Sequence, residues 1–186
     1  GLASPSTMTA YGARPDLSDV LLMTVSQSGG SPDLLETVRT ARAGGATTLA
    51  VTNNVNSALA QEAELHLDVL AGPEHAVAAT KSYSSQLLAL WQLIDAYRGG
   101  DGSAAVGIPE AAQSLIDRRA DVAGLAARFR FTDRLVTTGR GYSYPTAREA
   151  ALKLMETSYV AAHAFSGADL LHGPLAMIDH DHPVIA

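Results

Sequence analysis

The sequence contains no cysteine, and only 5% of its 186 residues are aromatic. The absence of cysteine excludes disulfide bonds, thiolate metal ligands and a cysteine nucleophile, and it is typical of a cytoplasmic protein. Alanine is abundant instead, and the chain has 16 glycines. Small residues of this kind favour helices that pack closely on a sheet.

Long apolar runs and an excess of basic residues are also missing. No apolar run approaches the ~20 residues that a membrane-spanning helix needs, so we expect no membrane partner. The formal net charge is −6 and no basic stripe is present, which argues against nucleic acid as a partner. The chain starts at Gly1 without a methionine and ends within an apolar run that begins at Pro183. We therefore expect a fragment, or a chain given only in part.

Strand and helix patterns alternate through the first half of the chain. The expected elements are a strand over 20–25, a helix over 34–43 capped by Ser31, a strand over 47–52, a helix over 57–64, a strand over 65–70 and a long helix over 80–97. Such alternation indicates a parallel sheet covered by helices on both faces. The predicted fold class is α/β.

The second half carries a similar set of elements. Residues 99–109 are rich in glycine and form the expected linker between a first domain over 1–98 and a second over 110–186. The elements expected beyond it are a helix over 109–127, a strand over 133–138, a helix over 146–162, a loop-rich segment over 163–182 and a last strand. Thr146 and Glu149 have the spacing of a capping box. We expect two α/β halves, both incomplete.

The loop over 26–31, with the sequence SQSGGS, passes from the first strand into a helix. Unpaired N–H groups and the helix dipole attract anions at such a place. The side chains that could donate to an anion are Ser26, Gln27, Ser28 and Ser31. The lysine of a GxxxxGK nucleotide loop is missing, which disfavours ATP and GTP. Spacing alone leaves two interpretations open: a phosphate cradle, or a turn whose serines only cap the helix.

Three charged residues share one face of the predicted helix over 146–162. Glu149 and Lys153 are four residues apart, and Lys153 and Glu156 are three apart. A solvated ladder of ion pairs is the commoner meaning of this pattern. The alternative makes Glu156 a base for proton transfer with Lys153 tuning it, because isomerisation beside a carbonyl group requires a base.

The histidines give weaker signals. His172 lies between apolar residues and a Gly-Pro turn, where a packed, hydrogen-bonded ring is commoner than a catalyst. His180 and His182 flank Asp181, but adjacent loop histidines without a further ligand are usually solvated. We therefore predict no metal site.

Several blocks together resemble the SIS (sugar isomerase) family, especially the isomerase part of glucosamine-6-phosphate synthase and its relatives without a glutaminase domain. The blocks are SQSGGSPD, TTLAVTN, GPEHAVAATKSYSSQL, GRGYSYPTAREAALKLMETSY and HGPLAMIDHDHPVI, in this order from about residue 17 to the end. The resemblance implies two SIS subdomains, each a flavodoxin-like three-layer αβα fold around a parallel sheet.

The resemblance also implies the residues that bind a substrate. The side chains expected to hold the phosphate of a phosphosugar are Ser26, Gln27, Ser28 and Ser31. Val77, within the block VAATK, would lie beside the sugar. No cofactor is implied.

The catalytic roles implied by the resemblance fall in the second half. Glu156 would move a proton between C1 and C2 of the sugar, with Lys153 close to it. His172 would assist ring opening and reach into the site of a partner subunit, which implies a homodimer.

Departures from the synthase pattern bear on the activity. The synthases have polar or charged residues where this chain has Ala79, Met155 and Leu171. A deaminase or another aldose–ketose isomerase, acting on a hexosamine or hexose 6-phosphate, therefore fits better. The alternative is a non-catalytic SIS module that binds a phosphosugar and regulates another process. A dinucleotide-dependent oxidoreductase is suggested only by the sequence GRG over 139–141, which lacks the full GxGxxG pattern.

Overall fold

The computed structural model describes residues 1–186, which divide into two compact units, residues 1–105 and 106–186. The division falls within the stretch 99–109 of the sequence. Each unit has its own parallel sheet of three strands, and each is described by itself. No helix in the chain combines the length and the apolar character needed to cross a membrane.

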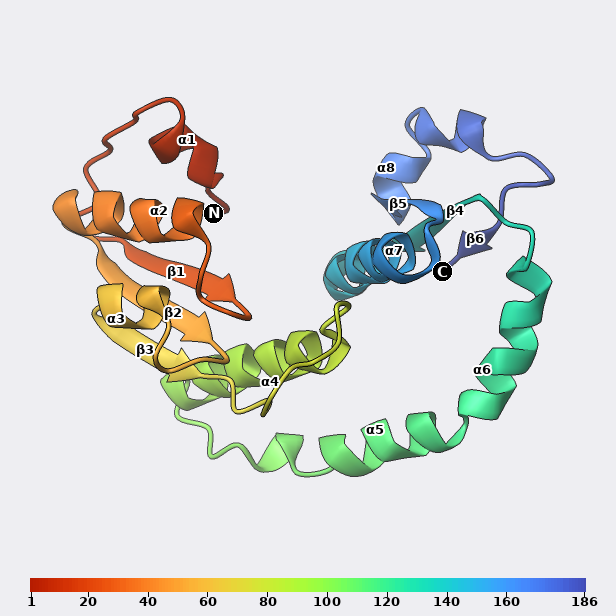
Figure 1. Ribbon diagram of the computed structural model, residues 1–186, viewed down its shortest axis with the longest axis horizontal. Helices are drawn as coiled ribbons and strands as arrows, with labels where there is room; N and C mark the ends of the chain where they lie inside the picture. The colour runs from red at the N-terminus through yellow and green to blue at the C-terminus, as the bar shows by residue number, and fades with distance from the viewer. The chain divides into compact units, whose positions relative to one another are not determined.

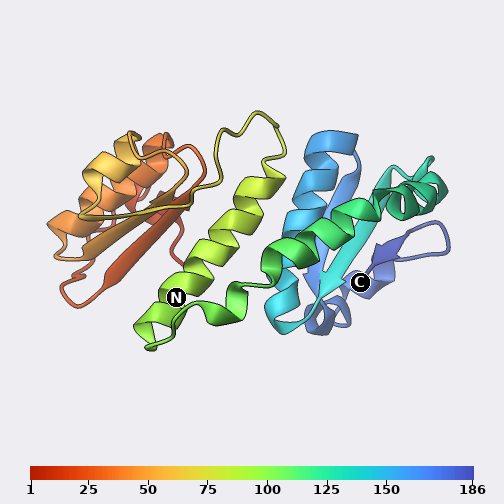
Figure 2. The same ribbon diagram turned by 90° about the horizontal axis from the view of Figure 1, so that it is seen from below.

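The strands and α-helices of unit 1 are shown in Figures 1 and 2. They are α1 (Pro5–Thr9), β1 (Leu21–Ser26), α2 (Pro32–Ala43), β2 (Thr47–Thr52), α3 (Ala58–Glu62), β3 (Leu65–Asp68) and α4 (Thr80–Tyr97). The sequence predicted all of these except α1, for which no helix was expected. As predicted, Ser31 caps α2, its side chain accepting a hydrogen bond from the N–H of Leu34.

The sheet of unit 1 has the order β1-β2-β3 and lies between two helical layers. On one face Val38 of α2 and Leu59 of α3 pack with Ala50 of β2 in a buried cluster. On the other face Leu49 and Val51 of β2 form a cluster against which α4 packs. All three strands run in parallel, so their carboxyl ends meet at one edge of the sheet, as the arrowheads in Figure 1 show.

Unit 2 contains a second parallel sheet with α7 against one face, and α7 runs alongside β4 in Figure 2. Its elements are α5 (Ile108–Asp117), α6 (Arg119–Ala126), β4 (Arg134–Gly139), α7 (Tyr144–Ser158), β5 (Ala161–Ser166), α8 (Gly167–Leu170) and β6 (Val184–Ile185). The strand order is β5-β4-β6, so the first strand lies between the next two. The flavodoxin-like order 2-1-3-4-5 begins in the same way.

The predicted boundaries of α7 were wrong at both ends. The helix begins at Tyr144 after Ser143, so Thr146 lies inside the first turn and forms no capping box with Glu149. The helix ends at Ser158 because Tyr159 adopts a left-handed conformation with φ 56°. Residues predicted to be its last turn start β5 instead, where Ala162 pairs with Leu135 of β4.

Two further expectations are corrected in unit 2. The single helix predicted over 109–127 is interrupted at Arg118, whose backbone (φ −88°, ψ 12°) leaves helical geometry and separates α5 from α6. The segment 163–182, predicted to be rich in loops, includes most of β5, all of α8 and a short 3₁₀ helix over Pro174–Met177.

Candidate functional site

The serine-rich loop lies at the carboxyl end of β1 and leads into α2, a helix of 12 residues. Ser26 Oγ accepts a hydrogen bond from the N–H of Gly29 at 3.1 Å, and Ser28 Oγ accepts one from Gly30 at 3.3 Å. Ser31 Oγ accepts from Leu34 in the helix cap. Because each hydroxyl is an acceptor here, its own proton stays available to an anion. The loop therefore offers several donors at a helix N-terminus.

The backbone of this loop is held by neighbouring segments. Gly29 is buried with φ +65°, and a Cβ atom placed there would collide with the side chain of Ser57. The Gly29 carbonyl oxygen accepts the N–H of Leu59 at 3.1 Å, and the Gln27 carbonyl oxygen accepts the N–H of Asn53 at 3.0 Å. These contacts fix the loop before any ligand arrives, which lowers the entropic cost of binding.

Val77 lies in the segment between β3 and α4, which leaves the sheet from the same edge as the serine loop. Its side chain is 88% exposed. Val77 and the four predicted phosphate ligands therefore all belong to unit 1. Glu156, Lys153 and His172 all belong to unit 2.

On α7 one cation is shared between two carboxylates. Lys153 Nζ lies 2.8 Å from Glu156 Oε2 and 3.3 Å from Glu149 Oε1, and the lysine side chain is 20% exposed. Partial burial by itself would lower the pKa of Lys153. The hydrogen bond to Glu156 and the negative charge of Glu149 outweigh that effect and raise the pKa above its ordinary value. Lys153 thus stays charged and holds Glu156 by its Oε2 atom.

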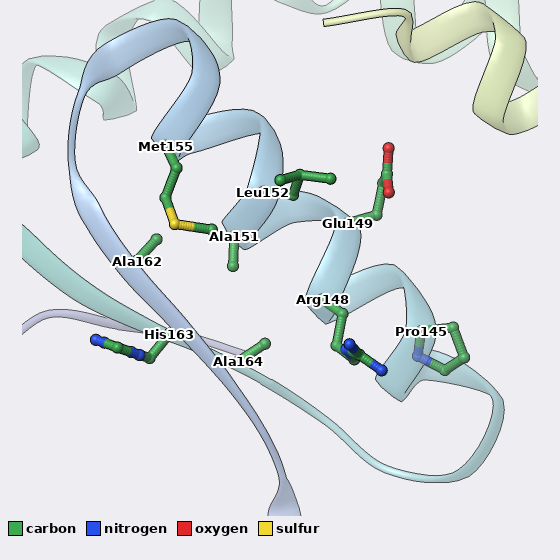
Figure 3. A pocket seen from close by; sticks show the side chains of 9 residues that line it. All are labelled: Pro145, Arg148, Glu149, Ala151, Leu152, Met155, Ala162, His163 and Ala164. Carbon is green, nitrogen blue, oxygen red and sulfur yellow. The ribbon is translucent and has the colours of Figure 1, made fainter. Parts of the chain in front are cut away.

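A pocket of ≈ 440 Å³ lies beside these residues, between α7 and β5. Its floor is small or apolar, and Arg148, Glu149 and His163 supply its polar groups. In Figure 3 Arg148 and Glu149 point in different directions, and His163 points away from the helix. The polar groups do not converge, so this pocket lacks the arrangement typical of a ligand site. No sequence pattern predicts this pocket, because it depends on how α7 packs against β5.

His172 follows α8, and its side chain is exposed. Its main-chain N–H donates to the carbonyl oxygen of Asp169 at 3.0 Å, and Gly173 then turns the chain with φ 121°. The structure shows no hydrogen bond or ion pair between His172 and Glu156 or Lys153 within the chain. The ring is thus available to solvent or to another molecule, and it is not the packed histidine that is commoner in such a position.

The two histidines near the C-terminal end differ from each other. His180 is exposed and lies 3.1 Å from Asp181. His182 was expected to be solvated, but it is 4% exposed, and its Nδ1 lies 2.8 Å from the carbonyl oxygen of Met177. The turn between the 3₁₀ helix and β6 encloses the ring, which the sequence could not reveal.

Comparison with known proteins identifies the family. The family model of the SIS domain matches residues 17–96 and 129–186, which include the serine loop, the Lys153–Glu156 pair and His172. The chain belongs to the SIS domain family. The matched segments leave out α5 and α6, which lie between the two SIS regions.

Individual SIS relatives are similar over most of this chain. A glutamine–fructose-6-phosphate aminotransferase (isomerizing) from Thermotoga maritima is 37% identical over 176 residues, covering 89% of this chain and 29% of that protein. A crystal structure of a phosphosugar isomerase from Silicibacter pomeroyi DSS-3 has a TM-score of 0.84 at 38% identity, covering 98% of this chain and 56% of that one.

A third relative is a glucosamine-6-phosphate deaminase from Thermotoga maritima. Its crystal structure has a TM-score of 0.74 at 25% identity and covers 95% of this chain and 55% of its own. The chain thus spans about three tenths of the aminotransferase and about half of either solved structure. These comparisons show a protein of the SIS domain family with a flavodoxin-like α/β fold, similar to phosphosugar isomerases and to an isomerizing aminotransferase.

Proposed function

We propose that this protein converts a hexosamine or hexose 6-phosphate by moving a proton between C1 and C2, with deamination of glucosamine 6-phosphate to fructose 6-phosphate as the preferred version. The observation that carries the proposal is the Lys153–Glu156 pair at 2.8 Å. A carboxylate held by a lysine at one oxygen is suited to act as a general base. The similarity to an isomerizing aminotransferase and to a deaminase supports the same chemistry.

The substrate phosphate is assigned to the loop of unit 1. Its negative charge suits the helix N-terminus and the hydroxyl protons of the three serines. Gln27 adds an amide donor, and Val77 is placed beside the sugar. The loop anchors the substrate and takes no part in bond breaking.

The proposed reaction starts from the open-chain sugar. His172 transfers a proton during ring opening, and we infer that it acts in the site of a partner subunit, so that the active form is a homodimer. Glu156 removes the proton from C2 and returns it to C1, which turns the amino aldehyde into a C2 imine with a C1 hydroxyl. Water then adds to C2, and ammonia leaves as the C2 carbonyl forms.

The test is the replacement Glu156→Gln, which keeps the size and removes the base. We expect turnover of glucosamine 6-phosphate to fall by at least about 100-fold, because general-base catalysis contributes 10²–10⁴-fold, while binding of the phosphosugar changes little. Glu110→Gln, on α5 and exposed, is the matched control and should keep full activity. Unchanged turnover in Glu156→Gln would remove Glu156 from the mechanism.

A second measurement distinguishes a deaminase from other isomerase activities and from a non-catalytic phosphosugar sensor. The full-length protein is incubated with glucosamine 6-phosphate alone, and with fructose 6-phosphate plus ammonia. Release of ammonia without any need for glutamine supports the deaminase. Binding of either sugar without turnover supports the non-catalytic SIS sensor, which would use the same serine loop.

A further inference from the structure

The side chain of Asn53 connects two segments at the carboxyl edge of the sheet in unit 1. Asn53 follows β2, and its Nδ2 donates to the carbonyl oxygen of Gly72 at 2.8 Å. Its Oδ1 accepts the N–H of Ala71 at 2.9 Å. The amide thus makes both kinds of hydrogen bond that a neighbouring strand would make, and both of its polar ends are used.

The main chain of the same residue holds the serine loop. The N–H of Asn53 donates to the carbonyl oxygen of Gln27 at 3.0 Å. The preceding residue, Thr52, is fully buried, and its Oγ1 lies 2.9 Å from Nε2 of His66 and 3.0 Å from the carbonyl oxygen of Asn54. Asn53 is therefore attached to a rigid part of the sheet, and one residue contacts both the serine loop and the segment that begins at Ala71.

The segment over 69–79 needs such support because of its backbone geometry. Leu70 has φ 56° and Gly72 has φ 66°, so left-handed residues lie on both sides of Ala71. A left-handed conformation is unfavourable for leucine and persists only where surrounding contacts impose it. Further along, Glu74 accepts a 2.7 Å hydrogen bond from Ser82 of α4, which ties the middle of the segment to that helix. The path from Ala71 to the exposed Val77 is thus set at its start by Asn53.

We propose that Asn53 is a positioning residue for substrate selection: its side chain fixes the segment that carries Val77, while the serine loop is held by its main chain. This inference rests on the proposed function, because it assigns Val77 to the sugar and the loop to the phosphate. A consequence is that the side chain of Asn53 affects recognition of the sugar and leaves recognition of the phosphate unchanged.

Two variants and one control test this separation. Asn53→Ala removes both side-chain hydrogen bonds, and Asn53→Asp keeps an acceptor for Ala71 but sets an oxygen against the carbonyl oxygen of Gly72. Both variants keep the main-chain N–H that binds Gln27. Asn54→Asp is the matched control, because it adds the same charge at the next position and its Oδ1 still accepts the N–H of Asn56.

Binding of glucosamine 6-phosphate and of inorganic phosphate is measured by calorimetry on the full chain. We expect Asn53→Ala and Asn53→Asp to weaken binding of the phosphosugar about tenfold, the equivalent of one hydrogen bond, and to leave binding of inorganic phosphate within about twofold of the wild type. Asn54→Asp should leave both affinities unchanged. An equal loss of affinity for both ligands, or no loss of affinity for either, would overturn the selective role of Asn53.

Amide hydrogen exchange provides a readout that needs no ligand. In Asn53→Ala the N–H of Ala71 should lose its protection, while the amides of the serine loop keep theirs. Unchanged protection at Ala71 would overturn the inference even if the phosphosugar binds. A wild-type chain that binds neither compound would instead refute the proposed function and the selective role with it, so the two failures are distinguishable.

Discussion

Lys153 Nζ lies 2.8 Å from Oε2 of Glu156, one turn further along α7. Glu149, one turn earlier, contacts the same nitrogen at 3.3 Å. The sequence allowed two interpretations of these residues, a solvated ladder of ion pairs or a base tuned by a lysine. In the structure they form a partly buried cluster in which two carboxylates share one cation. Exposed ladders contribute little to stability, whereas partly buried pairs are screened less by salt.

The cluster predicts a dependence of stability on alkaline pH. The pKa of Lys153 is raised in the folded state, so its ion pairs stabilise the fold fully below the unfolded pKa, about 10.4, and this contribution is lost as pH rises through the folded pKa. Glu149→Gln should therefore be less stable than the wild type at neutral pH, and the difference should fade above about pH 10.4. Urea unfolding across this range measures it. If the difference in unfolding free energy between the wild type and Glu149→Gln does not depend on pH, the stabilisation does not come from the ion pairs of Lys153.

Gly29 is predicted to tolerate no side chain. Gly29→Ala would place a Cβ against Ser57 in a residue with φ +65°, so we expect a loss of about 2 kcal/mol or more in the free energy of unfolding, and loss of phosphate binding. Gly30→Ala is the matched control, because the nearest atom to its Cβ would be Ser28 Oγ at 3.6 Å. Thermal unfolding and phosphate titration of both variants measure the effect. Equal stability and equal phosphate affinity of the two variants would show that the loop can accommodate a side chain at Gly29.

Glu74 should titrate at a lower pH than an ordinary glutamate. The hydrogen bond from Ser82 lowers its pKa, burial partly opposes this, and contacts with Ala76 and Lys81 add to the lowering. The stabilisation from a depressed pKa is present above about pH 4.3, the unfolded value, and is lost as pH falls through the folded value. Ser82→Ala should raise the pKa of Glu74, as seen by NMR titration of the carboxyl group. Ser84→Ala, whose hydroxyl bonds only to Thr80 of its own helix, should not.

Leu59 is predicted to support the serine loop through the core. It is fully buried between α2 and β2, and its N–H binds the carbonyl oxygen of Gly29. Leu59→Ala should cost about 2–5 kcal/mol in the free energy of unfolding. Leu87→Ala, at a half-exposed position of α4, should cost about 1 kcal/mol or less. Denaturant unfolding of the two variants compares them, and similar losses would place Leu59 outside the core.

Elements with strong local signals were predicted well. The strand over 47–52 and the helix over 80–97 have the bounds of β2 and α4, because apolar patterns and flanking turn residues set them locally. Ser31 was recognised as a cap from its place before Pro32 and Asp33. Spacing also predicted that Lys153 shares a helix face with Glu149 and Glu156, and the structure brings these three side chains together. The binding and catalytic roles of these residues and of the serine loop stay predictions.

Elements that depend on distant partners were not predicted well. The alanine-rich residues after Tyr159 looked like the end of a helix, but Ala162 is buried because it pairs with Leu135 and packs on Ala151. His182 is buried because the turn before β6 folds over its ring. The hydrogen bonds of the Asn53 side chain were not predicted, since its partners lie 18 and 19 residues away in the chain.

The sequence by itself therefore determined the α/β class, the order of most strands and helices, and the residue types that suit a phosphosugar. Local periodicity and short motifs are sufficient for these, because each is specified within a few consecutive residues. Only the tertiary structure decided that Lys153 is shared between two carboxylates, that Gly29 fits against Ser57, and that Asn53 links two loops at the sheet edge. Those relationships depend on which strands pair and which faces are buried, and long-range packing alone sets both.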